Sequence, residues 1–221
     1  MAFVVRVWDA PTRIFHWVMA SCVVALLITA QIGGAAMEWH FRLGYTVLVL
    51  LMFRFVWGLL GGHWSRFRSF LFPPSQILRY LQGENKGDRW AGHNPAGALS
   101  VFALLGFLAL QVTSGLFSDD EISATGPLTR FVSSSWVSNA TYYHKEIGKL
   151  VLMALVTLHV SAIIFYYVKK RENLVRAMIT GNKHLAELTQ ESEDKITDRT
   201  KAAAVLLVCA AAVWGALRWL G

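Results

Sequence analysis

The chain has few charged residues. Only 16% of its 221 residues are Asp, Glu, Lys or Arg, whereas a soluble globular domain has roughly a quarter. Hydrophobic residues make up 55% of the sequence, and they are gathered into long runs. This composition disfavours a soluble domain and predicts an all-α integral membrane protein.

Cysteine is also scarce. Cys22 and Cys209 both lie inside apolar runs, so no disulfide framework is expected. The sequence contains no Cys-x-x-Cys-His segment to attach haem covalently, so neither zinc nor c-type haem is favoured. The net charge of +7 does not predict nucleic-acid binding, because the basic residues lie beside the apolar runs.

Five apolar runs are long enough to cross a membrane. About 20 helical residues, at ~1.5 Å of rise each, span a hydrocarbon layer of ~30 Å. The first run is not expected to be cleaved, because His16 and Trp17 are poor signal-peptide residues. The predicted spans are Ile14–Ile32, Leu43–Leu60, Ala96–Phe117, Ile147–Val168 and Ala202–Leu220.

The basic residues predict the orientation of these spans. Two Lys or Arg residues precede the first span, five lie between the second and third, and eight lie between the fourth and fifth. These fifteen belong to one side of the membrane, while Glu38, Asp119, Asp120 and Glu121 lie on the other. The positive-inside rule therefore predicts a cytoplasmic N-terminus and a C-terminus outside.

Histidines are the most informative polar residues. Ionisable side chains in or beside spans are costly, so they are functional candidates. With the predicted orientation, His16 and His159 lie toward the inner side, and His40 and His144 lie at the outer rim. The 15 residues from His144 to His159 would turn a regular helix by 1500°, about 60° from four full turns. Both rings would then face the same side.

Two histidine pairs at matched depths fit b-type haem, in which two imidazoles from facing helices ligate one iron. Gly44 and Gly148 each follow a histidine by four residues, where a missing side chain lets a flat ring approach. We predict His16 with His159 as ligands of an inner haem and His40 with His144 as ligands of an outer haem. Any one of these histidines alone would be better explained as a rim or packing residue.

Other polar residues are predicted to contact haem propionates. Arg54 lies toward the inner side of the second span, where its guanidinium suits a propionate, although snorkelling to the interface is an alternative. Arg42 and Lys145 adjoin the outer ligands, where simple rim anchoring explains them equally well. His93 repeats the His-x-x-x-Gly spacing but lacks a partner at its depth, so a propionate contact or a helix-start role is predicted.

These motifs resemble those of one family. The segment from Val7 to Trp17, His40-x-x-x-Gly44, Gly92 to Gly97, and the stretch carrying His144 and His159 are similar to the bacterial cytochrome b561 and nickel-iron hydrogenase b-type cytochrome superfamily. The resemblance covers roughly Val5 to Lys183. It implies a four-helix haem-binding transmembrane bundle with two haem b groups in the bacterial inner membrane. In that membrane, the orientation predicted from the basic residues places the C-terminus in the periplasm.

The resemblance also implies a function. Members transfer electrons between the quinone pool and a periplasmic or membrane-associated redox partner, such as a c-type cytochrome or hydrogenase, so the chain would be an electron-transfer subunit of a quinone-linked oxidoreductase. Membrane lipid, quinone and a second copy of the chain are the other expected partners. Two alternatives stay open: a superoxide or quinol oxidoreductase acting at the outer haem, and a membrane anchor subunit for a soluble redox partner.

The C-terminal part extends beyond the resemblance. Residues 1–183 are predicted to form the di-haem domain, and residues 184–221 a cytoplasmic linker and an extra C-terminal transmembrane helix. The mixed charges before the fifth span predict a solvated linker. Between the second and third spans, Pro73 to Ser75 before Gln76–Leu81 predict a short helix on the inner surface.

Overall fold

The computed structural model describes residues 3–84, 90–120 and 124–220. Lys86, Arg89 and Glu121, which were counted in predicting the membrane orientation, lie outside the described residues. In the described part, five helical segments are long and apolar enough to cross a membrane, which confirms the predicted number. They are Ala10–Ile32 (α1), Ala36–Leu60 (α2), Pro95–Leu116 (α4), Ser134–Lys169 and Ile196–Leu220 (α8).

All five helical segments begin earlier than predicted, and the second and fourth differ most. α2 begins at Ala36 rather than Leu43, so His40 lies inside the helix. The fourth segment consists of α5 (Ser134–Tyr142), the π-helical turn η4 (Tyr143–Gly148) and α6 (Lys149–Lys169). Hydropathy marks only the apolar part of a helix, whereas the backbone hydrogen bonds continue into the polar first turns.

Shorter elements connect the spans. α3 (Pro74–Gln82) begins with a proline, whose missing N–H costs nothing there, and it is followed by Gly83, whose φ of 83° gives a left-handed C-cap. This confirms the short helix predicted around Gln76–Leu81. The remaining elements are β1 (Phe3–Arg6), η1 (His63–Ser65), η2 (Phe67–Phe70), η3 (Thr129–Phe131), α7 (Leu174–Thr180) and β2 (Asn182–Leu185).

The chain divides into two compact units, and all five candidate spans contribute to both. The first unit contains Met1–Phe15, Arg54–Ala103 and Thr157–Val205, and the second contains His16–Phe53, Leu104–Val156 and Leu206–Gly221. In the second unit, α1 is joined to α2 by a tight turn at Gly33 and Gly34, with φ of 66° and 53°. Residues other than glycine rarely adopt these positive φ angles.

Many large apolar side chains on the long helices are exposed. Leu158, Leu207 and Trp219 are examples, with exposed fractions of 67%, 70% and 79%. In a soluble protein such faces would promote aggregation, but in a bilayer the lipid tails are as apolar as leucine. The helices are therefore suited to a hydrocarbon environment.

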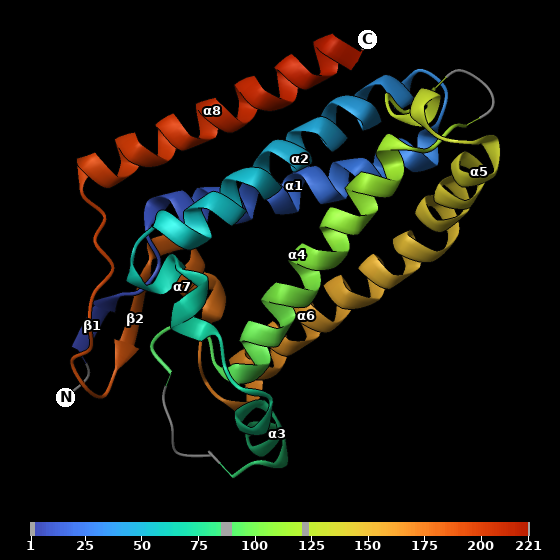
Figure 1. Ribbon diagram of the computed structural model, residues 1–221. Helices are drawn as coiled ribbons and strands as arrows, with labels where there is room; N and C mark the ends of the chain where they lie inside the picture. Colours follow the sequence, from blue (N-terminus) through green and yellow to red (C-terminus); the bar gives the residue numbers. More distant parts are fainter. Residues whose placement is uncertain (1–2, 85–89, 121–123, 221) are drawn as a thin grey trace. The chain divides into compact units, whose positions relative to one another are not determined.

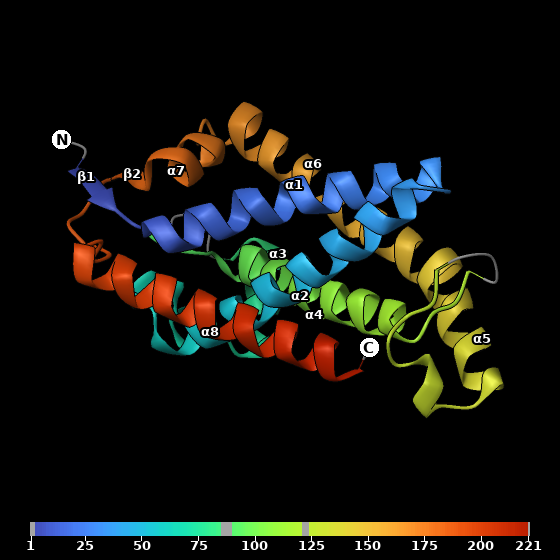
Figure 2. The ribbon, with the colours of Figure 1, turned by 90° about the horizontal axis from the view of Figure 1, so that it is seen from above.

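In the first unit, the N-terminal strand pairs with a distant strand. β1 and β2 lie side by side, as Figures 1 and 2 show. They pair antiparallel, with Phe3 opposite Leu185 and Arg6 opposite Asn182. The backbone N–H groups of Val7 and Trp8 both donate to the carbonyl of Gly181, at 2.8 and 3.0 Å. The chain entering α1 is thereby held to the segment that follows α7.

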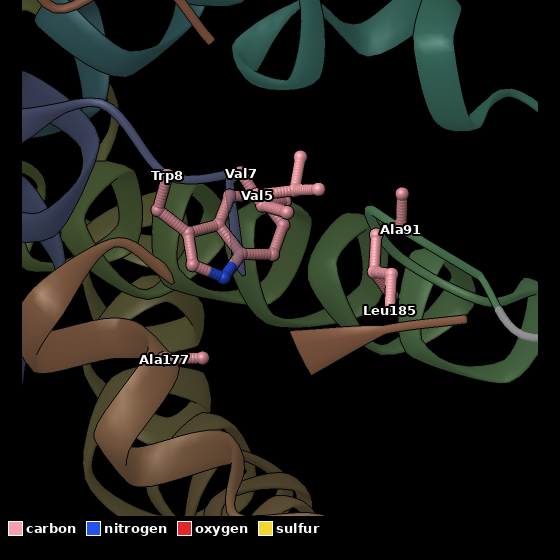
Figure 3. Close-up of a cluster of buried hydrophobic side chains, with 6 residues drawn as sticks. All are labelled: Val5, Val7, Trp8, Ala91, Ala177 and Leu185. Carbon is pink, nitrogen blue, oxygen red and sulfur yellow. The ribbon is translucent and has the colours of Figure 1, made fainter. Parts of the chain in front are cut away.

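A small hydrophobic core forms around this pairing. Figure 3 shows its side chains, which come from the N-terminal segment, the loop before α4, α7 and β2. The core residues are Val5, Val7, Trp8, Ala91, Ala177 and Leu185. These residues lie far apart in the sequence. Their burial therefore stabilises the contact of the N-terminal segment with the loop before α4 and with α7 and β2.

Asp194 adds an ionic anchor to the same region. Its side chain is 1% exposed and accepts two hydrogen bonds from Arg199, at 2.9 and 3.0 Å. Arg6 and Arg13 form ion pairs with it at 3.5 and 3.6 Å, and the Ala10 N–H at the start of α1 donates to it. A carboxylate is favoured at a helix N-terminus.

The segment before α8 is mostly exposed, as expected for a solvated linker, but two of its residues are not. The Asp194 side chain is buried, and the Ser192 hydroxyl donates to the carbonyl of Val7 at 2.5 Å. The sequence did not predict this anchor, because a run of mixed charge has the same appearance whether each charge is solvated or paired with distant arginines. Glu193 and Lys195, on either side of Asp194, form an exposed ion pair.

We expect Asp194→Asn to destabilise the protein by roughly 1–3 kcal/mol, because charge-assisted hydrogen bonds from arginines would be weakened. Glu193→Gln, which changes the exposed neighbouring carboxylate, should have an effect below about 0.5 kcal/mol. Thermal unfolding in detergent compares the two variants, and equal melting temperatures would contradict the anchor.

The same carboxylate should make stability depend on pH. Burial raises the pKa of Asp194, but hydrogen bonds from Arg199 and Ala10 and the nearby arginine charges outweigh it, so the pKa lies below its ordinary 3.8. The contribution is present above pH 3.8 and is lost as the pH falls through the lower folded-state pKa. Asp194→Asn should remove this acid-side loss from the melting curve measured against pH.

Candidate functional site

The second unit brings His40 and His144 together. His40 lies in the first turns of α2 and His144 lies in the π-helical turn η4. Their ring centroids are 6.1 Å apart, and their planes are nearly perpendicular at 89°. The predicted outer pair therefore consists of neighbouring side chains from two different spans.

Each ring is oriented by a backbone carbonyl. His40 Nδ1 lies 3.1 Å from the carbonyl oxygen of Leu26 on α1, and His144 Nδ1 lies 2.9 Å from that of Gln111 on α4. A carbonyl can only accept, so each Nδ1 carries the proton and each Nε2 keeps its lone pair. This is the usual outer-shell arrangement of a metal-ligating histidine.

Hydroxyl groups accompany both carbonyl contacts. Thr29 Oγ1 lies 3.3 Å from His40 Nδ1, and Ser114 Oγ lies 3.2 Å from His144 Nδ1. Both hydroxyls also donate to carbonyls within their own helices. The four helical segments of this unit that carry Leu26, His40, Gln111 and His144 thus converge on one pair of imidazoles.

The spacing of the rings fits a haem iron. With a metal–nitrogen bond of about 2 Å on each side, two imidazoles on opposite faces of one iron have centroids about 6 Å apart. The observed 6.1 Å matches this distance, and the neutral Nε2 atoms are the required donors. Residues His40 and His144 therefore fit a bis-histidine haem.

Gly115, which no sequence motif identified, lies against the His144 ring. A Cβ placed on Gly115 of α4 would come within 2.9 Å of His144 Cε1. Gly44, which was predicted to leave room for a flat ring, would place its Cβ where no described heavy atom lies within 4 Å. Gly148 instead faces the side chains of Gln111 and Tyr143.

The other predicted outer residues are exposed. Arg42 forms an ion pair with Glu38 one turn earlier on α2, and its guanidinium lies 5.2 Å from the Trp39 ring centroid. Lys145 is exposed beside His144. A propionate contact for either residue stays a prediction.

The first unit contains Arg54 and His93, two residues predicted to contact haem propionates. Arg54 is buried, donates to the carbonyl of Ser65 at 3.0 Å and lies over the Phe67 ring. Buried Asp9 accepts hydrogen bonds from the Trp57 indole at 3.2 Å and the Ser65 hydroxyl at 2.6 Å. These hydrogen bonds form a polar network at the start of α1. Asp9 belongs to the segment from Val7 to Trp17, which resembles that of the family.

His93 lies between two aromatic rings. Its centroid is 4.6 Å from that of Trp8 and 4.5 Å from that of Phe70, and its Nδ1 is buried without a hydrogen-bond partner among the described residues. Burial, followed by the charges of Arg54 and Lys183, lowers the pKa of His93 to about 3. A neutral ring with an unused polar atom is compatible with the predicted propionate contact.

The predicted inner ligand pair is not brought together within one unit. His16 belongs to the second unit and His159 to the first. Their pairing therefore stays a prediction. The helix between His144 and His159 also includes η4, so the uniform rotation of 100° per residue assumed from the sequence does not hold along its whole length.

An apolar cavity of about 270 Å³ lies elsewhere in the second unit. Leu48 and Met52 of α2, Leu116 of α4, and Val213 and Leu217 of α8 contribute to its lining. All of its lining residues are apolar. It can accommodate hydrocarbon but offers no group that would orient a polar ligand.

Comparisons with known proteins point to the same chemistry. The family model described as prokaryotic cytochrome b561 matches residues 7–181. A "Probable Ni/Fe-hydrogenase B-type cytochrome subunit" from Bradyrhizobium diazoefficiens is 24% identical over 218 residues, which cover 83% of this chain and 87% of that protein. No solved structure matches the chain significantly.

Two further relatives have similar names. The "Probable Ni/Fe-hydrogenase B-type cytochrome subunit" of Azotobacter chroococcum is 26% identical over 216 residues, covering 80% of this chain and 87% of the relative. The "Probable Ni/Fe-hydrogenase 1 B-type cytochrome subunit" of Escherichia coli K12 is 22% identical over 210 residues, covering 79% and 88%. The similarity therefore extends over most of each chain.

We expect Gly115→Ala to displace the His144 ring, because the added methyl group overlaps Cε1 and overpacking costs about 1–3 kcal/mol. Gly106→Ala, on the same helix with nothing within 4 Å of the new Cβ, is the matched control. Haem content and melting temperature should fall for the first variant only. Equal values for the two variants would contradict the close packing of α4 on His144.

Proposed function

The chain belongs to the prokaryotic cytochrome b561 family, and from that premise we propose that it is a di-haem cytochrome carrying electrons across the membrane. At the family level it is a multi-pass membrane b-type cytochrome with a four-helix haem bundle, and electron transfer follows from the family. The number of haems, their ligands, the quinone and the redox partner are our proposals.

The His40 and His144 pair carries the proposal. The rings lie 6.1 Å apart, and the carbonyl contacts of both Nδ1 atoms leave both Nε2 atoms unprotonated, as ligands of one iron would have to be. An alternative role in packing alone would not require both rings to have the same tautomer and to lie at a distance suited to a shared metal. We therefore assign these residues to an outer haem b.

We assign His16 and His159 to an inner haem b. The assignment rests on their matched predicted depth and on the family resemblance of the segments that carry them. Arg54 and His93 lie in the first unit with His159 and are proposed to contact propionates. The buried guanidinium would pair with a carboxylate, while the unpartnered Nδ1 of His93 would take part in a hydrogen bond.

The protein's role in the proposed mechanism is to hold the haem groups and to orient the histidines that would ligate them. Bound haem supplies one-electron redox chemistry. The carbonyls of Leu26 and Gln111 keep His40 and His144 in one tautomer and increase the basicity of the ligand nitrogens. The apolar helices exclude water around both pairs, and two pairs at different depths provide two steps across the hydrocarbon layer.

The proposed electron path joins membrane quinone to a partner outside the cytoplasm. The relatives are named as hydrogenase cytochrome subunits, which supports a hydrogenase-like partner, and a periplasmic c-type cytochrome would serve the same purpose. The family resemblance supports the quinone. The cytoplasmic placement of the N-terminus rests on the distribution of Lys and Arg.

The haem count tests the ligand assignment. We expect about two b haems per purified chain, measured by pyridine haemochromogen absorbance against protein concentration. His144→Ala should remove the outer haem and His159→Ala the inner one, each leaving about one, because a haem with one axial imidazole missing is weakly held. His184→Ala changes an exposed residue of β2 and should retain both haems.

Two haems in the His159→Ala variant would contradict the inner pair, and two in His144→Ala would contradict the outer pair. Haem-free wild-type protein from a haem-sufficient host would contradict the di-haem proposal as a whole. Reduced-minus-oxidised spectra on the same samples identify which haem is lost.

Reporter fusions test the orientation. Alkaline phosphatase joined after Gly221 should be active, because the fifth span would place it outside the cytoplasm, whereas a fusion after Lys170 should be inactive. Green fluorescent protein at the same two positions should give the opposite pattern. Active phosphatase at Lys170 would contradict the proposed topology.

A further inference from the structure

Gln111 of α4 contacts both the ring and the backbone of His144. Its carbonyl oxygen accepts from His144 Nδ1 at 2.9 Å, and its side-chain Nε2 donates to the carbonyl oxygen of His144 at 2.9 Å. All these atoms belong to the second unit. One residue therefore fixes the tautomer of the imidazole and also holds the peptide that carries it.

The peptide that Gln111 holds lies in an unusual turn. Tyr143–Gly148 is π-helical, so its backbone hydrogen bonds run from residue i to residue i+5. Such turns are rare, occur mostly as single turns and are frequent at functional sites. A donor from a neighbouring helix stabilises a carbonyl in this widened turn, and Gln111 supplies that donor.

Gly148 leaves the room that Gln111 needs. A Cβ at Gly148 would overlap the amide oxygen of Gln111 and would come within 2.8 Å of Tyr143 Cε1. The glycine that follows His144 by four residues is thus explained by the glutamine side chain. His40 is different, because it lies in a regular helix and its Nδ1 faces the carbonyl of Leu26 and the hydroxyl of Thr29.

We propose that Gln111 is a positioning residue that keeps η4 in its π-helical form and thereby aims His144 Nε2 at the outer iron. The inference rests on the proposed function, because it assigns the iron to His40 and His144. Without the Nε2 donor, the turn would relax toward a regular α-helix. Since each residue of an α-helix turns by 100°, the imidazole would then point in a different direction.

The effect should be confined to one haem. Outer-shell partners of metal ligands typically contribute about 10- to 100-fold to metal affinity or activity. Gln111 contacts the proposed outer ligand His144, and the proposed inner ligands are His16 and His159. Removing the amide donor should therefore weaken the outer haem and leave the properties of the inner haem unchanged.

The test uses the full-length, haem-loaded protein in detergent. Gln111→Met keeps the length of the side chain but removes the donor, and Gln111→Leu removes the donor with a shorter apolar side chain. Thr113→Val, an exposed position on the same helix, is the matched control. The measurements are haem transfer to excess apomyoglobin, a redox titration of both haems, and the electron paramagnetic resonance spectrum of the ferric low-spin haems.

We expect both Gln111 variants to lose one haem about tenfold faster or more, with a changed midpoint potential and changed resonance lines for that haem alone. Thr113→Val should match the wild type. If Gln111→Met cannot be purified, Gln111→Leu decides the question with the same measurements.

The outcomes separate the two proposals. A wild type with two haems, and Gln111 variants whose outer-haem loss rate, potential and resonance lines are all unchanged, would overturn the role of Gln111 alone. Changes of equal size in both haems would also overturn it, since a purely structural weakening would produce them. A wild type without haem would overturn the proposed function and this inference with it.

Discussion

The hydrogen bond from an imidazole Nδ1 to a backbone carbonyl is the interaction on which the candidate site depends. In a hydrocarbon environment, no water competes for the carbonyls of Leu26 and Gln111 or for the ring nitrogens. Each histidine must therefore find its partner within the protein, and that partner determines which nitrogen remains available for iron. The same contacts fix the distance between the two rings. The same contacts therefore determine the tautomers of both imidazoles and join the helices of the second unit.

In the first unit, two carboxylates with several hydrogen-bond and ion-pair partners stabilise the N-terminal end of α1. Asp9 and Asp194 are both buried, and each is satisfied by several donors. Asp194 joins Arg6, Arg13 and Arg199, whereas Asp9 accepts from Trp57 and Ser65. Buried carboxylates without such partners would be strongly destabilising. The strand pairing of β1 with β2 completes the attachment of the segment before α8 to the start of the chain.

Much of the fold could be predicted from the sequence, because a bilayer requires each spanning helix to be a continuous run of mostly apolar residues. Long apolar runs identify the five helical segments, and ionisable residues at the rims of these runs identify His40 and His144 as candidates. The sequence did not reveal Gly115, Gln111 or the burial of Asp194. Glutamine and glycine in an apolar helix have no periodic signal that distinguishes a ligand-orienting residue from one that faces lipid. The π-helical turn also has no clear sequence signature, so the helix was expected to be regular.

The sequence by itself determined that the protein crosses the membrane, which segments form helices and which histidines are candidates for haem. These properties follow from hydrophobicity and from the cost of placing a polar side chain in hydrocarbon, and both are read along the chain. Only the tertiary structure decided that the rings of His40 and His144 lie 6.1 Å apart, that carbonyls on α1 and α4 accept from their Nδ1 atoms, and that the Gln111 side chain donates to the carbonyl of His144 in the π-helical turn. These contacts join residues from different helices, so their geometry exists only after the helices have packed.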